Sequence, residues 1–251
     1  MIDTHAHLHL IDRPLDDILS AAKHAGVQHI IQVAIDVGSI QHNVSLYAGH
    51  SMCSITAGIH PLSVDSVEDF DAVIRLLRDH MDDIVAIGEI GLDYKYGGAN
   101  IPQQVRYFKA QMDLAAMHQK PVIIHSRYAD NDMLAIVNAY PQLKKVFHCY
   151  ATHIDFFDAL EGDQNYVSFT GMITYAKKGK VIRALKQVPL NRLMLETDAP
   201  YMVPKGIDAN QNSPEYVGHI ADAIAHHRDM SREELISKTT QNAHDFFKLP
   251  H

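Results

Sequence analysis

Short hydrophobic runs, rich in β-branched residues, alternate along the chain with longer amphipathic stretches. The opening MIDTH is followed by seven such runs, at residues 27–35, 54–60, 84–91, 121–126, 145–150, 166–171 and 192–198. Runs of this kind are typical of strands that are buried on both faces, as the strands of parallel sheets are. The pattern therefore predicts eight parallel strands.

The stretches between these runs carry hydrophobic residues at helical spacing. One hydrophobic stripe lies within residues 15–22 and another within residues 70–77, as expected for helices that pack one face against a sheet. After the last run, two further helices are expected at residues 214–228 and 231–247. The second begins with Ser231, followed three residues later by Glu234, which is a capping-box pattern.

The repeated order of strand and helix is typical of an α/β fold. We expect a (β/α)8 TIM-type barrel, regular or slightly distorted, with extra C-terminal helices. A doubly wound open sheet is the alternative, but its first strand is usually followed by a glycine-rich phosphate loop, which this sequence lacks. No linker or low-complexity segment divides the chain, so residues 1–251 are predicted to form a single domain.

Composition narrows the class of protein further. The chain has no run of eighteen hydrophobic residues, which predicts no transmembrane helix, and its opening lacks the basic and hydrophobic regions of a signal peptide. Cys53 and Cys149 are far apart and follow no zinc-finger spacing. This argues against a disulfide framework and favours a reducing compartment, so the cytoplasm is the expected location.

The net charge of −8 bears on the partners that the protein can have. An acidic protein repels polyanions, so wrapping of a long duplex by a basic face is not expected, although a local positive site can still bind a phosphate. We expect neither a membrane partner nor an obligate protein partner. The chain also has 18 histidines, of which His24, His226 and His227 lie on polar helical faces and are expected to be solvated.

Other histidines and carboxylates stand at the ends of the predicted strands. His5 and His7 are two residues apart in the opening strand, so their imidazoles point to the same face. Further potential ligands end four later runs, namely Glu89, His125, His148 and Asp198. Because the carboxyl ends of parallel strands meet at one rim of a barrel, these six side chains are predicted to converge.

Six ionisable groups are costly to bury together without a cation. Two divalent ions, Zn, Mn or Mg, would satisfy both the charges and the lone pairs, with Glu89 as the bridge because it is the only carboxylate among the middle strands. Such a site activates water for hydrolysis. Asp198 is predicted to bind a metal and also to take the proton of the attacking water, and Glu196 to hydrogen-bond to a ligand rather than bind a metal itself.

Residues near the same strand ends are candidates for binding the substrate. Arg127 offers a charged fork for a phosphate or carboxylate, or else forms a surface salt bridge, and His60 ends the third run. Six tyrosines also fall near strand ends, namely Tyr94, Tyr96, Tyr128, Tyr150, Tyr175 and Tyr201. Their rings either stack on bases or serve as packing, and packing is the more common role of tyrosines at barrel rims.

In these stretches the sequence resembles the TatD family of metal-dependent hydrolases, within the amidohydrolase-like barrels. The matching segments span nearly the whole chain and are IDTHAHL, GIHP (58–61), IGEIGLDY (87–94), KPVIIHSR (120–127), FHCY (147–150), SFTGMIT (168–174) and LMLETDAPYMVP (193–204). The combination of GEIGLDY and ETDAPY in this order is highly specific, whereas an H-x-H motif alone is not.

The resemblance implies a (β/α)8-type barrel, a divalent-metal site and hydrolysis of DNA phosphodiesters, typically as a nuclease that trims 3′ ends. The family's metal positions match His5, His7, Glu89, His125, His148 and Asp198, and its asparagine and proline after the last strand match Asn212 and Pro214. Two positions differ from the family. Leu62 stands where a further histidine is common, and Tyr128 stands where an acidic residue commonly follows the arginine.

Three functions therefore remain open from the sequence. The first is a metal-dependent deoxyribonuclease that acts on DNA ends or short single strands. The second keeps the metal centre but hydrolyses small amides, lactones or phosphate esters, because related barrels share one metal cage across many reactions. The third is a metal-binding scaffold without turnover, although a chain with such a role would tolerate the loss of some of its six ligands.

Overall fold

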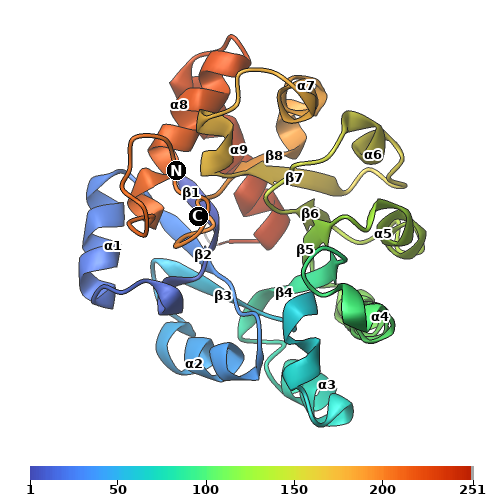
Figure 1. Cartoon of the computed structure of the whole chain (residues 1–251). Helices are drawn as coiled ribbons and strands as arrows, with labels where there is room; N and C mark the ends of the chain where they lie inside the picture. Colours follow the sequence, from blue (N-terminus) through green and yellow to red (C-terminus); the bar gives the residue numbers. More distant parts are fainter. Residues whose placement is uncertain (250–251) are drawn as a thin grey trace.

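The computed structural model describes residues 1–249, so the last two residues of the predicted single domain lie outside the described part. Eight parallel strands form one sheet in which each strand pairs with the next along the chain (Figure 1). They are β1 (Ile2–Ala6), β2 (His29–Gln32), β3 (Cys53–Ala57), β4 (Ile84–Asp93), β5 (Val122–Arg127), β6 (Lys145–Phe147), β7 (Asn165–Phe169) and β8 (Leu193–Leu195).

Helices surround this sheet on the outside (Figure 1). They are α1 (Leu15–His24), α2 (Val37–Tyr47), α3 (Phe70–Asp79), α4 (Ile101–His118), α5 (Asp130–Val137), α6 (Ile154–Asp158), α7 (Lys180–Gln187), α8 (Val217–His227) and α9 (Arg232–Phe247). Short 3-10 helices are η1 (Leu8–Leu10), η2 (Pro61–Ser66), η3 (Gly98–Asn100), η4 (Gly171–Thr174), η5 (Leu190–Arg192) and η6 (Pro214–Tyr216). The predicted (β/α)8 barrel with extra C-terminal helices is confirmed.

Some element ends differ from the sequence prediction. The last strand stops at Leu195 rather than continuing to residue 198, and Asp198 has a φ of 53°, which no strand residue adopts. The helix expected at residues 214–228 begins with a 3-10 turn at Pro214, and its α-helical part starts at Val217. At the start of α9, the Ser231 side chain accepts a hydrogen bond from the Glu234 backbone, as the capping pattern predicts.

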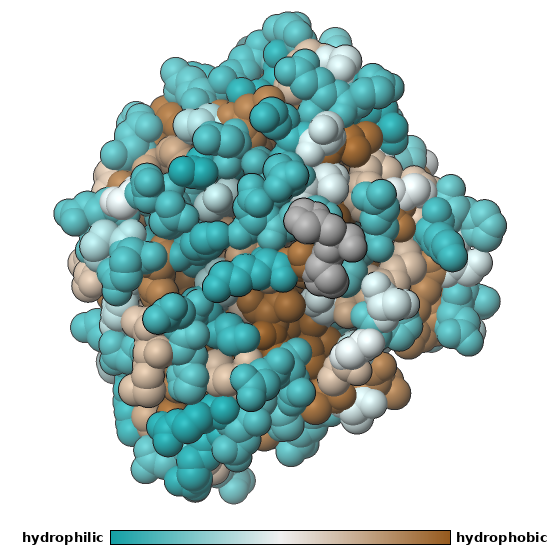
Figure 2. Space-filling model, turned by 180° about the vertical axis from the view of Figure 1, so that it is seen from behind, coloured by the Kyte–Doolittle hydropathy of each residue, from teal (hydrophilic) through white to brown (hydrophobic). Residues whose placement is uncertain are grey.

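Two hydrophobic clusters hold these layers together. Alternate strand residues point inward, and the smaller cluster joins Ile31, Val146 and Met194 to Phe246 and Phe247 of α9. The larger cluster lies between the strands and the surrounding helices. Seen from behind, the surface is mostly hydrophilic, with hydrophobic residues visible in a central hollow (Figure 2). Within residues 1–249, no helix has both the length and the hydrophobicity needed to span a bilayer.

The first and last strands meet through a short seam. A bridge pairs Ala6 with Ala199, the Asp198 amide donates to the His5 carbonyl at 2.9 Å, and the His7 amide donates to the Ala199 carbonyl at 2.8 Å. These bonds join the backbone just beyond β8 to the backbone of β1. The seam therefore brings the first and last of the predicted ligands side by side.

Lys145, the first residue of β6, is a buried cation without a carboxylate partner among the described residues. Its side chain is fully buried, and its Nζ donates to the carbonyls of Tyr140 at 2.8 Å and Leu143 at 3.1 Å. Burial lowers the pKa of Lys145 to about 8. Folding therefore favours the neutral amine at this position.

We predict that replacing Lys145 by methionine changes how stability depends on pH. Between about pH 8 and about pH 10, the unfolded chain holds a proton on Lys145 that the folded protein has released, so the free energy of unfolding rises with pH through this residue. Denaturant unfolding at both ends of this window should therefore show the wild type gaining stability relative to Lys145→Met. The exposed Lys238→Met variant is the control, and equal slopes for both variants would contradict the assignment.

Candidate metal centre

The structure brings the six predicted ligands together at the carboxyl end of the barrel. His5, Glu89 and His125 lie within strands β1, β4 and β5. Of the other three, His7 and His148 directly follow β1 and β6, and Asp198 lies three residues beyond the end of β8. Five of these side chains are buried, and His125 is partly exposed. Their roles as ligands remain predictions, whereas their convergence is a feature of the structure.

Four of these side chains direct one atom each toward a common point. The His5 and His7 Nε2 atoms are 3.2 Å apart, and each lies 3.3–3.8 Å from Glu89 Oε2 and Asp198 Oδ1. Donor atoms that bind one ion at about 2.1 Å lie about 3.0–3.4 Å from one another. The spacing and the mixed nitrogen and oxygen set therefore fit a divalent cation such as Zn, Mn or Mg.

The other oxygen of Glu89 faces a second group. Glu89 Oε1 lies 2.9 Å from His125 Nδ1, 2.7 Å from His148 Nε2 and 3.5 Å from His60 Nε2. The His125 and His148 nitrogens are themselves 3.4 Å apart. Because the two oxygens of one carboxylate point to different sets of imidazoles, Glu89 has the geometry of a bridge between two cations.

The charges in this cluster are strongly coupled. Burial alone would raise the pKa of Glu89, but the positive charge of His148 and hydrogen bonds from His125 and His148 hold that pKa well below its usual range. Burial would lower the pKa of His148, yet Glu89 and Glu196 raise it well above its usual value. The buried carboxylates are thus balanced by protonated imidazoles, and divalent cations fit the same sites by replacing those protons.

Two carboxylates support the histidines from behind. The predicted supporting residue Glu196 accepts hydrogen bonds from the Cys149 amide at 2.6 Å and the Ser168 hydroxyl at 2.5 Å, and lies 3.5 Å from His148 Nδ1. Asp93, which sequence reasoning missed, lies 3.2 Å from His125 Nε2. Asp93 is four residues after Glu89 on the same face of β4, and this spacing is the signal that would have identified it.

Close contact between β4 and β5 depends on a glycine. Gly91 pairs with His125 and has a φ of 144°, and a Cβ atom there would lie 2.0 Å from the His125 carbonyl oxygen. Any side chain at this position would push the strand that carries His125 away from the strand that carries Glu89. Gly91, the second glycine of GEIGLDY, is therefore needed to keep the predicted ligands His125 and Glu89 close to each other.

A buried hydrogen-bond network holds the seam beneath Asp198. Asp3 is fully buried and accepts hydrogen bonds from the Thr197 amide at 2.9 Å, the Thr197 hydroxyl at 2.5 Å and the His5 amide at 3.3 Å. Asn212, predicted only through the family pattern, donates to the carbonyls of Thr197 and Tyr201. The two residues fix the turn that presents Asp198 to His5.

The predicted substrate residues lie beside this centre. His60 packs its ring against His125 at 4.5 Å and lies within reach of the Glu89 cluster, so it is also placed to bind a cation with Glu89 and His125. The Arg127 guanidinium lies over the ring of Tyr96 at 4.8 Å. In the described part of the chain Arg127 forms no ion pair, so the alternative of a surface salt bridge is not observed.

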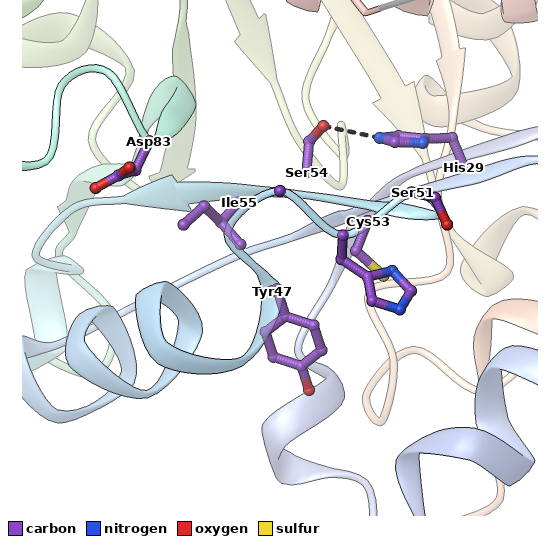
Figure 3. A pocket seen from close by; sticks show the side chains of 9 residues that line it. His29, Tyr47, Ser51, Cys53, Ser54, Ile55 and Asp83 are labelled. Carbon is purple, nitrogen blue, oxygen red and sulfur yellow. Dashed lines mark hydrogen bonds between the residues drawn. The ribbon is translucent and has the colours of Figure 1, made fainter.

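Another hollow, of about 270 Å³, lies where strands β2 and β3 begin (Figure 3). His29 and Ser54 are hydrogen-bonded at 2.8 Å on its wall. Its one thiol is that of Cys53, and burial raises the pKa of this thiol to about 12, so the reactive thiolate does not form near neutral pH. Within the described residues, the histidines and the carboxylate of this hollow form no cluster of metal-ligating atoms like the one at the opposite end of the barrel.

Comparison with known proteins gives matches over nearly the full chain. The family described as TatD related DNase matches residues 2–248. The chain is 31% identical to the uncharacterized metal-dependent hydrolase YabD of Bacillus subtilis, over 99% of both chains. It is also 31% identical to the 3'-5' ssDNA/RNA exonuclease TatD of Citrobacter koseri, over 93% of both.

A solved structure agrees with these matches. The TatD homolog YJJV of Escherichia coli superposes with a TM-score of 0.89 and 25% identity, covering 100% of this chain and 98% of the other. The resemblance predicted from the motifs is confirmed by these comparisons.

We predict that removing the Asp3 carboxylate weakens the seam. Asp3→Ala leaves buried hydrogen-bond donors of Thr197 without a partner and should lower the free energy of unfolding by about 2–4 kcal/mol. Denaturant unfolding measures this loss, with Asp208→Ala on an exposed loop as the control. Equal stability of the two variants would show that the network does not hold the seam.

We also predict that divalent metal stabilises the fold through Glu89. A cation at roughly 100 times its Kd should raise Tm by roughly 5–10 °C, because it binds the folded state alone. Glu89→Gln should lose most of this shift in thermal unfolding with Mn or Zn, and Glu233→Gln, exposed on α9, should keep it. A full shift in Glu89→Gln would rule out the bridging position.

Proposed function

Since the chain belongs to the family of TatD-related DNases and is a metal-dependent hydrolase, we propose that its substrate is DNA and that it removes nucleotides from 3′ ends or short single strands. The observation that carries the chemistry is Glu89, whose two oxygens face separate groups of imidazoles. The support for a nucleic acid comes from relatives named as 3'-5' ssDNA/RNA exonucleases.

The proposed site has room for two divalent ions. His5, His7, Glu89 and Asp198 would hold one ion, and Glu89, His125 and His148 would hold the other. Bound there, such ions would supply an activated water and positive charge for the phosphate. Asp93 and Glu196 keep the imidazoles of His125 and His148 oriented toward Glu89.

Side chains of the protein carry out the proton transfer and bind the phosphate. Asp198 accepts the proton of the attacking water. Burial would raise the pKa of Asp198, but hydrogen bonding to His7 and the nearby charge of His5 lower it, so Asp198 is ionised at neutral pH and able to accept a proton. Arg127 and His60 bind the phosphate at the edge of the centre.

The overall charge restricts the form of DNA. With a net charge of −8, the protein gains nothing from contacts with a long duplex outside the site. Binding must therefore come from a few local contacts near the metal centre, which suits an end or a short single strand.

The test is nucleotide release from single-stranded oligonucleotides labelled at the 3′ or the 5′ end, with Mn or Mg added. We expect metal-dependent cleavage in which the 3′ label leaves first, and a loss of roughly 10²–10⁴ in kcat for Asp198→Ala, the usual contribution of a general base. Cleavage that equals the Asp198→Ala control would contradict the proposal. In that case a panel of amides, lactones and small phosphate esters would identify the bond that the centre hydrolyses.

A further inference from the structure

Exposed aromatic rings gather at the end of the barrel that carries the metal centre. In the described part of the chain the large exposed hydrophobic side chains include four tyrosines, Tyr96, Tyr128, Tyr175 and Tyr201, and each lies in a segment that follows a strand. Tyr94 and Tyr150 differ from them. Tyr94 donates its hydroxyl to Asp132 at 2.5 Å, and Tyr150 is buried and donates to the His153 carbonyl at 2.7 Å.

Tyr96 and Tyr128 are the most exposed of these rings, at 63% and 75%. Lys95 connects them, because its Nζ lies 4.9 Å from the ring centre of Tyr96 and 5.8 Å from that of Tyr128. The Arg127 guanidinium carbon lies 4.8 Å from the ring centre of Tyr96. We call these four residues, Lys95, Tyr96, Arg127 and Tyr128, the rim platform.

The rim platform is fixed to the metal centre by its backbone. Asp93 Oδ1 accepts hydrogen bonds from the Lys95 amide at 2.9 Å and the Tyr96 amide at 2.8 Å, while Asp93 Oδ2 faces His125 Nε2. The Tyr94 amide also donates to the Arg127 carbonyl at 2.9 Å. The same carboxylate therefore orients a predicted metal ligand and holds the loop that presents Tyr96.

Packing within the chain does not account for the two rings. Among residues 1–249, neither the Tyr96 nor the Tyr128 hydroxyl has a hydrogen-bond partner, and both rings leave most of their surface in water. Exposed aromatic surface costs free energy that a stacked ligand recovers. The two cations of the rim platform also form no ion pair within the described residues, although the chain as a whole is acidic.

The charges around the rim platform distinguish the base of a nucleotide from its phosphate. Beside Tyr128 lies a hollow of about 410 Å³ whose lining includes Asp130, Asn131 and Asp132. The carboxylates of Asp130 and Asp132 repel a phosphate and can accept hydrogen bonds from the amino groups of a base, whereas Lys95 and Arg127 attract the phosphate. A paired base inside a duplex has both of its faces covered by its neighbours, so it cannot stack on the rings, whereas an unpaired base can be splayed out to do so.

We propose that the rim platform binds an unpaired nucleotide next to the cleaved bond, with its base stacked on Tyr96 and Tyr128 and its phosphate held by Lys95 and Arg127. This inference rests on the proposed nuclease function and specifies it further. The protein recognises the π-face of a base rather than its sequence, and it requires a frayed or single-stranded end.

The experiment compares strands that differ by one base. Fluorescence anisotropy in EDTA measures Kd for a single-stranded oligonucleotide and for the same strand with an abasic residue at each of the first three 3′ positions. The wild type should bind the intact strand roughly 10–100-fold more tightly than the weakest abasic strand, the range expected for one or two stacking contacts. The Tyr96→Ala/Tyr128→Ala variant should bring this ratio close to one.

Two variants control for effects on folding and surface hydrophobicity. Tyr96→Phe/Tyr128→Phe keeps the rings and should keep the ratio, and Met117→Ala removes an exposed hydrophobic side chain from α4 and should also keep it. A wild type that binds intact and abasic strands equally would overturn the platform, and so would an alanine variant with an undiminished ratio.

A separate measurement tests the metal centre. Hydrolysis of bis(p-nitrophenyl) phosphate by the wild-type protein with Mn needs the phosphodiesterase chemistry and no base. If neither this ester nor any oligonucleotide is cleaved, the proposed function fails, while the anisotropy ratio still decides whether the platform binds a base. If both are cleaved and the ratio is close to one in the wild type, the platform alone fails.

Discussion

The burial of one carboxylate, Glu89, is the constraint on which the arrangement of this protein depends. Only 3% of this side chain is exposed, and it lies at the carboxyl end of a barrel that also encloses a hydrophobic cluster packed against α9. A lone buried carboxylate would be very costly, so positive charge has to surround it on every side. Imidazoles delivered by several different strands meet this requirement, and the closed parallel barrel brings the carboxyl ends of those strands together at one rim.

The imidazoles need support in turn, because a histidine that faces a carboxylate or a cation must keep one orientation. Asp93 provides it from β4, the strand next to that of His125, and Glu196 provides it for His148 from just beyond β8. Asp3 and Asn212 provide it for the turn that carries Asp198. Each of these supporting groups is itself satisfied by backbone amides or carbonyls. The six predicted ligands therefore belong to a larger buried polar network that extends into the strands.

The sequence pattern was sufficient to predict the barrel of parallel strands and the convergence of the six side chains at its rim. The strands read as hydrophobic runs, and a polar residue at the end of each run had to lie at the common rim. The spacing of Asp93 after Glu89 was a usable signal, but its interaction with His125 became evident only in the fold. Asp3 could not be found in this way, because its importance lies in hydrogen bonds to Thr197, 194 positions further along the chain. The rim tyrosines were also ambiguous, since Tyr150 and Tyr128 both lie within three residues of a strand end and only the fold buries one and exposes the other.

The seam between β1 and β8 has a consequence for the synthesis of the protein. Asp3 and Thr197 are separated by 194 positions in the chain, so a ribosome needs roughly 10–40 s to add the second after the first. Throughout that time His5 and His7 have no Asp198 to meet. In a nascent or prematurely ended chain the cluster of six predicted ligands is therefore incomplete, and it is completed only when the segment after the last strand has joined the first strand.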